Sequence, residues 1–381
     1  MLSSLNSPYY IIVGKFHDRW AGGNVGVALT AALPNYHNLQ SLTLLGHKYQ
    51  KNILPVIFAN IHRAAALIHL TIASNCIEEE SDFSLLDQLL SVRSLTILSP
   101  KNVILLPLPA WLEKLPQPLK ELRLEDNCGS VTPGTLKFLI PHLPDLEVFT
   151  LGLSYSVKDE DLFPFLGKLT RLRQLQLTYY IQLGALPKVT ISPSLVSFEV
   201  RYKMIHSRPH TNSLCTWVHQ IIAHTSLESL ELLCEDAEEY EGSGAHPSFD
   251  GLVKHLSVRH AKTLKTLRME DAFVGTPAMV DLMSNCRQLE HLAVSVRENF
   301  IPQCTTFLPS MPRLRTIDIR IVNAKPQKVL FSIEQAQNFL RDGTSNLRQI
   351  TVNGHGWKGE WCVQWDGDRP SAAFKLTEIQ D

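Results

Sequence analysis

The sequence predicts an α/β solenoid, a right-handed horseshoe with a parallel sheet on its inside and helices on its outside. Three observations predict this fold. The pattern apolar-x-x-apolar-x-apolar occurs twelve times, from residue 39 to residue 347, at a mean spacing of 28 residues. Segments of helical character separate the copies. Apolar residues make up 44% of the 381 residues, which is enough to bury a continuous core.

We expect residues 1–38 to form a degenerate first repeat that caps the array. The apolar run Tyr9–Val13 predicts a strand, and residues 24–33 have the spacing of the helix that belongs to it. A terminal repeat of a solenoid is atypical because only one of its sides is covered by a neighbour.

Residues 39–353 are predicted to form a solenoid of about twelve repeats. The last three positions of each copy alternate apolar-x-apolar, which is the period of a half-buried strand. One strand and one helix cannot bury an apolar face alone, so neighbouring repeats complete the core by stacking. The copies begin at Leu39, Leu67, Val92, Leu119, Leu146, Leu172, Leu195, Leu227, Leu264, Leu289, Leu314 and Leu347.

Helices are predicted between the strands, most clearly over residues 133–142, 159–169, 277–285 and 333–341. Thr132 and Thr276 each place a capping hydroxyl before a proline at the first helical position. Ser332 and Gln335 have the spacing of a capping box.

Residues 354–381 are predicted to form a tryptophan-rich cap and tail. Residues 354–359 match G-x-G-x-x-G, but a dinucleotide site needs a helix next, and residues 360–365 alternate like a strand. We therefore expect Trp361, Val363 and Trp365 to cover the exposed core of the last repeat.

Composition excludes several functions. The net charge of −1 does not suit a large phosphate-binding surface, so we expect no nucleic-acid partner. The seven cysteines are scattered without C-x-x-C spacing, which argues against a disulfide framework or a metal site. Without a leader pattern or a long apolar span, we expect a cytoplasmic or nuclear protein that does not contact membranes.

Catalysis is not expected, and neither is a cofactor. The sequence has no G-x-S-x-G, no H-E-x-x-H and no P-loop. The acidic residues 159–161 lie at a predicted helix start, where they favour the helix dipole. Cys362 and His355 could be considered a thiol pair, but no third group orients them.

The candidate binding residues are those at the third, fifth and seventh positions of each copy, together with tyrosines near the strand ends. These positions alternate with the strand leucines and should face the concave side, where repeat proteins bind their partners. The alternative is that the charges only pair across adjacent strands. The candidates are Glu121, Arg123, Glu125, Tyr155, Tyr179, Glu199, Arg201, Tyr202, Glu231, Arg268, Glu270, Asp318 and Arg320.

Two insertions lengthen the array. Residues 201–226 are rich in basic side chains, and residues 233–251 are acidic with a Gly-Ser-Gly stretch. The acidic one is interpreted as a solvated loop of low apolar content, or alternatively as a loop that closes over a basic partner.

The repeat resembles the leucine-rich repeat, L-x-x-L-x-L-x-x-N/C-x-L, with Asn75 and Asn127 at the asparagine position and Cys286 spaced as in the cysteine-containing subtype. The other copies lack Asn or Cys at that position, so a side-chain ladder should be weak. Long irregular repeats with a proline before the strand, as at Pro144 and Pro312, resemble the fungal F-box and leucine-rich-repeat proteins of ribonuclease-inhibitor-like type.

That resemblance implies a substrate-receptor subunit of a cullin-type ubiquitin ligase, which would bind a target protein and an adaptor. Only 38 residues precede the first clear repeat, and we expect no F-box in them. One alternative is a stand-alone scaffold or inhibitor. Another is a regulator resembling the repeat-built activators of small GTPases, whose repeats are shorter and richer in asparagine. We expect a monomer in each case.

Overall fold

A computed structural model describes residues 9–13, 39–45, 67–79, 83–182, 184–237, 247–322, 331–341, 346–366 and 369–380. The chain divides into two compact units. The first comprises Met1–Thr178 and Gln182–Ser194, and the second comprises Tyr179–Ile181 and Leu195–Asp381. Within the described residues, no helix has the length and apolar character needed to cross a bilayer.

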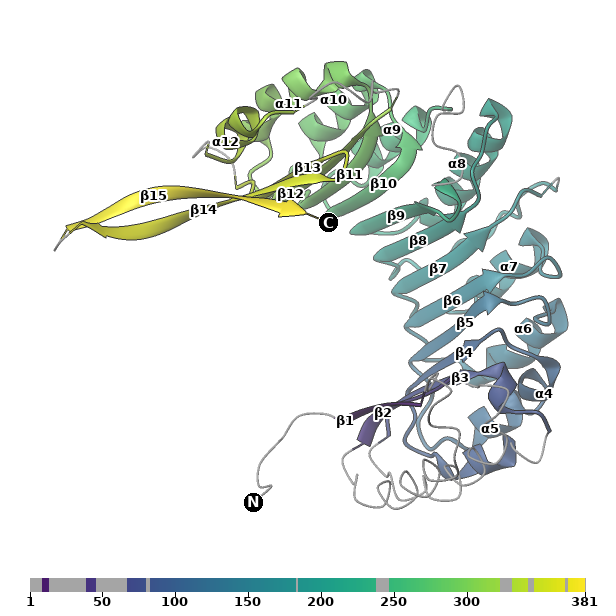
Figure 1. Cartoon of the computed structure of the whole chain (residues 1–381). Coiled ribbons are helices and arrows are strands. Elements are labelled where there is room, and N and C mark those ends of the chain that lie inside the picture. Colours follow the sequence, from purple (N-terminus) through teal and green to yellow (C-terminus); the bar gives the residue numbers. More distant parts are fainter. Residues whose placement is uncertain are drawn as a thin grey trace, which may run out of the picture. The chain divides into compact units, whose positions relative to one another are not determined.

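The first unit is a parallel sheet with helices on one face (Figure 1). Its strands follow each other in chain order, because each pairs with the strand of the next repeat. The strands are β1 (Tyr9–Val13), β2 (Leu39–Leu44), β3 (His69–Ala73), β4 (Ser94–Leu98), β5 (Glu121–Asn127), β6 (Val148–Leu153) and β7 (Gln174–Tyr179). The helices are α4 (Asn102–Leu105), α5 (Leu108–Lys114), α6 (Pro133–Leu139) and α7 (Asp159–Leu166), with 3-10 turns at Ser74–Cys76, Leu85–Gln88 and Ile140–His142.

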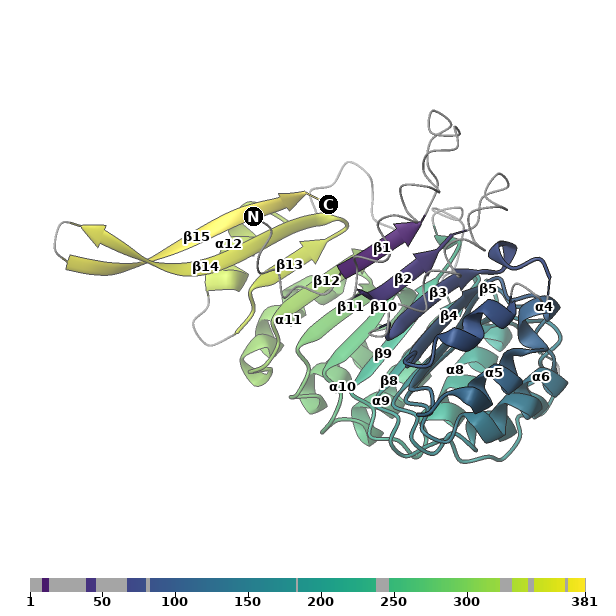
Figure 2. The same cartoon turned by 90° about the horizontal axis from the view of Figure 1, so that it is seen from below.

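The second unit repeats this arrangement and ends in a long antiparallel hairpin (Figure 2). Its parallel strands are β8 (Ser197–Tyr202), β9 (Ser229–Cys234), β10 (Thr266–Phe273), β11 (His291–Val296), β12 (Thr316–Ile321) and β13 (Gln349–Val352). Its helices are α8 (Arg208–Ile222), α9 (Asp250–Arg259), α10 (Thr276–Asn285), α11 (Ile301–Phe307) and α12 (Ile333–Arg341), with 3-10 turns at Glu298–Phe300 and Leu308–Ser310. The hairpin consists of β14 (His355–Asp366) and β15 (Arg369–Gln380).

The predicted strands are confirmed at all twelve copies and at Tyr9–Val13. Their alternating apolar side chains lie under the helices: Phe149 of β6 contacts Phe165 of α7 at 5.1 Å, and Phe198 of β8 contacts Trp217 of α8 at 6.0 Å between ring centroids. The residues between them point to the opposite side, which we call the open face of each sheet. The chain is thus an α/β solenoid of leucine-rich repeats.

Most of the predicted helix starts are confirmed. The Thr132 and Thr135 side chains form a reciprocal capping box, and Ser332 with Gln335 forms the other. The predicted cap at Thr276 is wrong. Helix α10 begins one residue earlier than expected, Gly275 is its N-cap, and the Thr276 hydroxyl instead bonds Asn299 Oδ1 at 3.3 Å.

The asparagine position of the repeat supports a turn rather than a ladder. Asn127 is exposed, and its Oδ1 accepts a hydrogen bond from Gly129 N at 3.0 Å within its own turn. The next residue, Cys128, is buried, and its thiol donates to the carbonyl oxygen of Leu124 at 3.3 Å. In this repeat the asparagine side chain therefore bonds within its own turn, and a weak or absent ladder stays a prediction for the array.

The ends of the chain differ from expectation. The predicted helix at residues 24–33 lies outside the described residues. The prediction that Trp361, Val363 and Trp365 cover the last repeat is wrong, because they are 47%, 66% and 68% exposed. Trp357 covers it instead: it is 6% exposed and contacts the Phe331 ring at 5.5 Å.

Candidate protein-binding face

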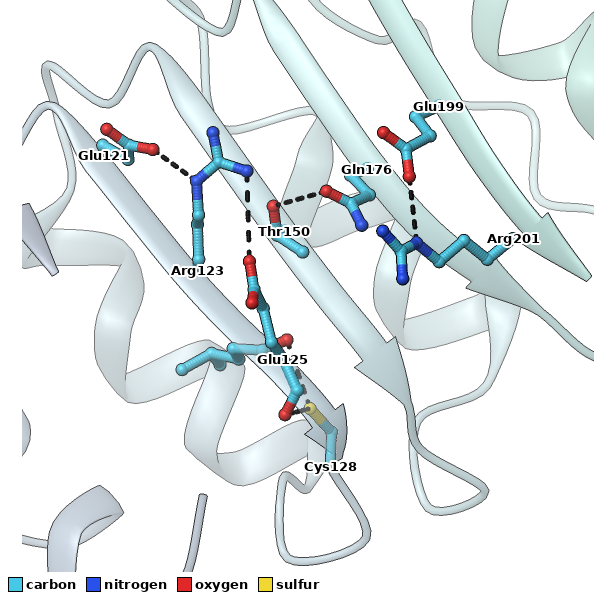
Figure 3. A network of polar contacts seen from close by, with 9 residues as sticks. Glu121, Arg123, Glu125, Cys128, Thr150, Gln176, Glu199 and Arg201 are labelled. Atoms are coloured by element: carbon cyan, nitrogen blue, oxygen red, sulfur yellow. Dashed lines mark hydrogen bonds and ion pairs between the residues drawn. The ribbon is translucent and has the colours of Figure 1, made fainter. Parts of the chain in front are cut away.

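Arginines on the open face pair with carboxylates two residues away in the same strand. In β5, Arg123 contacts Glu121 through Nε and Glu125 through Nη1, the latter at 4.0 Å (Figure 3). Side chains at i and i+2 share one face of a strand, so these pairs need no neighbouring strand.

The same pairing occurs in the second unit. Arg201 Nε lies 2.9 Å from Glu199 Oε1 in β8, and Arg268 Nε bonds Glu270 Oε1 in β10. The arginine side chains keep 46% and 50% of their surface exposed. Each of these pairs lies along a strand, whereas the alternative weighed from the sequence placed the pairing across adjacent strands.

Arg320 of β12 makes a different contact. Its Nη1 reaches Asp271 of β10, and the two side chains meet across β11, which presents the small residues Ala293 and Ser295 there. Asp271 lies within an irregularity in the β10–β11 register, between Met269 and Phe273, and its side chain is 17% exposed. Burial raises the pKa of Asp271, and Arg320 opposes that shift. Sequence reasoning missed Asp271 because the alternation in β10 predicts it on the other face.

Carboxylates outnumber arginines along β8–β12. These strands contain Glu199, Glu231, Glu270, Asp271 and Asp318 against Arg201, Arg268 and Arg320, a formal net charge of −2. Burial, and then Glu199, raise the pKa of Glu231, while Arg268 lowers it. Opposing charges thus lie within reach of each other, with negative charge in excess.

Two of the candidate tyrosines are not on this face. Tyr179 and Tyr202 are 7% and 1% exposed, and their rings contact Trp217 at 5.3 Å and Phe249 at 6.3 Å. Each lies two residues beyond the last leucine-type position of its strand, so it faces the core. Their prediction as binding residues is wrong, whereas Tyr155 is 69% exposed.

Pairing across adjacent strands does occur, at the second position of the repeat, which the sequence analysis did not single out. Lys120 Nζ lies 2.8 Å from Glu147 Oε1, and Lys265 Nζ lies 2.7 Å from Glu228 Oε2. The hydrogen bond from Lys120 lowers the pKa of Glu147. The backbones of the same two residues are also hydrogen-bonded, because Glu147 N donates to Lys120 O. The available signal was a charged residue directly after the leading apolar residue in nine of the twelve copies.

The two insertions differ in what the structure describes. Most of the basic one is helix α8, whose first turn is capped by the Ser207 hydroxyl. In the acidic one, Asp236 Oδ1 accepts a hydrogen bond from Met204 N at 2.6 Å. Residues 238–246 lie outside the described residues, so the prediction of a closing loop stays a prediction.

Metal ligands and cysteine thiols are the potentially reactive groups compared in the described part of the chain. No group of three His, Cys, Asp or Glu residues there could hold a metal ion. Burial raises the pKa of Cys128, Cys215, Cys234, Cys286 and Cys304 to about 12. These five thiols are therefore protonated at neutral pH and are poor nucleophiles.

Comparisons with known proteins leave the family open. No protein-family model matches the chain, and no curated protein matches it in sequence. A chain of the yeast Rad7–Elc1 complex has 14% identity and a TM-score of 0.43, over 86% of this chain and 75% of that one. A chain of the TLR13–ssRNA13 complex has 13% identity and a TM-score of 0.38, over 84% of this chain and 52% of that one. The fold assignment depends on the strands, helices and buried leucines described above.

Proposed function

We propose that the open faces of the repeat strands bind a protein. The observation that carries this proposal is the set of partly exposed arginines held beside carboxylates, Arg123, Arg201 and Arg268. A guanidinium group makes planar, bidentate contacts to carboxylates and also stacks on aromatic rings. Arginines are frequent among the residues that dominate binding energy at protein interfaces.

The i, i+2 pairing also lowers the cost of binding. A long side chain that is already held in one geometry loses less conformational freedom when a partner covers it. An exposed ion pair adds only about 0–1 kcal/mol to folding stability, so stability alone gives little reason to place these pairs in β5, β8 and β10.

We further propose that the chain acts as the substrate-receptor-like subunit of a cullin-type ubiquitin ligase, in the cytoplasm or nucleus. The support for this step is the resemblance of the repeats to F-box and leucine-rich-repeat proteins. The bound target would lie on the open faces, and an adaptor would join the chain to the ligase. A stand-alone scaffold or inhibitor that binds a protein without a ligase is the alternative.

Affinity capture on the full chain tests both steps. We expect Arg201→Ala with Arg268→Ala to weaken target capture at least tenfold, because each buried arginine can account for about 2 kcal/mol. The melting temperature should stay nearly unchanged. Lys137→Ala on helix α6 is the matched control and should alter neither.

The composition of the captured complex separates the alternatives. A cullin and its adaptor, recovered with both the wild type and the arginine variant, would support the ligase subunit. A target recovered without them would support the scaffold. Capture that survives the arginine changes would place the binding surface elsewhere.

A further inference from the structure

The β14–β15 hairpin extends well beyond the sheet that it joins. Its twelve-residue strands pair from His355 opposite Gln380 to Asp366 opposite Arg369, but only residues 355–358 also pair with β13. In Figures 1 and 2 its far half runs clear of the other described elements of its unit. We call residues 359–366 and 369–376 the free ribbon.

One face of the free ribbon continues the core face of the repeats. Trp357 lies opposite Ile350 of β13, a core residue, so its side chain is on the helix-covered side of the sheet. Strand alternation puts Trp361, Val363 and Trp365 on that same face.

The second strand completes this face. In β15, Phe374, Ala372 and Pro370 lie opposite Trp361, Val363 and Trp365 of β14, respectively. Directly opposed residues of an antiparallel pair share a face. The Trp361 and Phe374 rings pack edge to face at 5.3 Å. The six residues of these three consecutive cross-strand pairs are therefore all apolar and carry no charge.

The chain covers only the base of this face. Helix α12 lies against it there: an added Cβ on Gly359 would approach Leu340 Cβ to 2.8 Å. Beyond Gly359 the Trp361, Val363 and Trp365 side chains are about half to two-thirds exposed. Every parallel strand places this face against the core, and an isolated two-stranded hairpin is marginally stable at best in water.

We propose that the free ribbons of two copies of this chain stack face to face, each covering the tryptophan face of the other. Stacked sheets pack about 10 Å apart, a distance that interdigitated aromatic side chains fill. An uncharged face is compatible with itself, because stacking brings no like charges together. The opposite face of the free ribbon, with Glu360 and Lys375, remains in water.

The area of this contact sets its strength. With about 150–250 Å² per aromatic side chain, the exposed fractions leave on the order of 400 Å² of apolar surface per ribbon. Two stacked ribbons bury on the order of 800–1,000 Å², the range of weak, reversible complexes. The sequence analysis expected a monomer and also expected these tryptophans to be covered; their exposure is the reason for the change.

Sedimentation velocity on the full chain between about 1 and 100 μM tests the stacking. We expect the mean mass to rise with concentration from 42.9 kDa towards twice that value. Trp361→Ser with Trp365→Ser should weaken association at least tenfold, since buried tryptophans dominate such contacts. Gln364→Ala, on the opposite face of the same strand, is the matched control and should associate like the wild type.

A second variant keeps the test decisive if the tryptophan double variant fails to fold. Residues 361–374 are replaced by Asn-Gly, which joins the opposed pair Glu360 and Lys375 through a two-residue hairpin turn. This shortened ribbon should remain folded and monomeric. A wild type that stays at one chain mass throughout, or variants that associate as the wild type does, would overturn the proposal. Either result leaves the open-face proposal untouched, because the two surfaces share no residue.

Discussion

A pair of neighbouring residues in β7 tests the strand register. Leu175 is 3% exposed in the core, whereas Gln176 faces the open side and makes only a weak hydrogen bond with Thr150 at 3.5 Å. Leu175→Ala should lower the free energy of unfolding by about 2–5 kcal/mol because it leaves a cavity. Gln176→Ala should change it by about 0.5 kcal/mol or less. Equal costs in denaturant titrations would contradict the register.

Whether a strand alternates strictly decides whether the face of each of its residues could be predicted from the sequence. Tyr202 continues the parity of Phe198 and Val200, so its burial follows from the sequence once the strand is extended by two residues. Asp271 does not follow, because the register irregularity in β10 shifts it relative to its neighbours. A backbone irregularity of this kind leaves no clear signal in a pattern of apolar residues.

A close backbone contact between β5 and β6 depends on one glycine. A Cβ on Gly152 would lie 2.4 Å from the carbonyl oxygen of Asp126, whose φ of +61° places it in the left-handed region. Backbone cannot move aside as a side chain can, so Gly152→Ala should cost about 1–3 kcal/mol of unfolding free energy. Gly251→Ala in α9, with no atom within 4 Å of its Cβ, should be neutral or stabilising. Thermal unfolding that ranks them the other way would be inconsistent with this contact.

The packing of α8 and α9 should depend on pH. The His219 and His255 rings lie 3.5 Å apart and those of His255 and His260 5.6 Å apart, and the described residues offer no hydrogen-bond partner to four of their ring nitrogens. Burial first, and then the neighbouring histidines and Arg259, lower the pKa of His255 to about 4. Burial, followed by Arg259 and His219, does the same for His260.

These histidines are neutral in the fold and take up protons on unfolding below their ordinary pKa of 6.5. Their contribution to stability is therefore complete above pH 6.5 and is lost as the pH falls towards 4. Between pH 7 and pH 5 the unfolding constant should rise by up to roughly twentyfold for each of the two. His260→Leu should flatten this dependence in denaturant titrations, and His210→Gln, exposed on α8, should not. Parallel pH profiles for wild type and His260→Leu would contradict the explanation.

Elements with local signals were predictable from the sequence. Helix α6 has proline and a capping hydroxyl at its start, and α12 has its capping box; both begin where expected. The hairpin shows the limit of such signals. Alternation identified a strand in residues 360–365, but it could not show that the strand leaves its own sheet, because alternation specifies which residues share a face and not what covers that face.

The division into two units had a signal in the repeat spacing. The step from Leu172 to Leu195 is the shortest in the array, at 23 residues. Residues 180–196 contain no helix among those described, and the division falls within them. A repeat too short for a helix has less surface to pack against its neighbours, which is the physical reason for a boundary there.

The integrity of the last repeat should depend on the base of the hairpin and not on its free ribbon. Truncation after Asn353 removes Trp357 and exposes Phe331, Leu340 and Ile350, so we expect α12 and β13 to fray and their amides to exchange faster with solvent. The shortened ribbon keeps Trp357 and its strand partners, so exchange in α12 should match the wild type. Hydrogen exchange on both chains makes the comparison. If the truncated chain protects α12 as well as the full chain does, Trp357 is not the cap, and the stability of the last repeat comes from contacts within α12 and β13 alone.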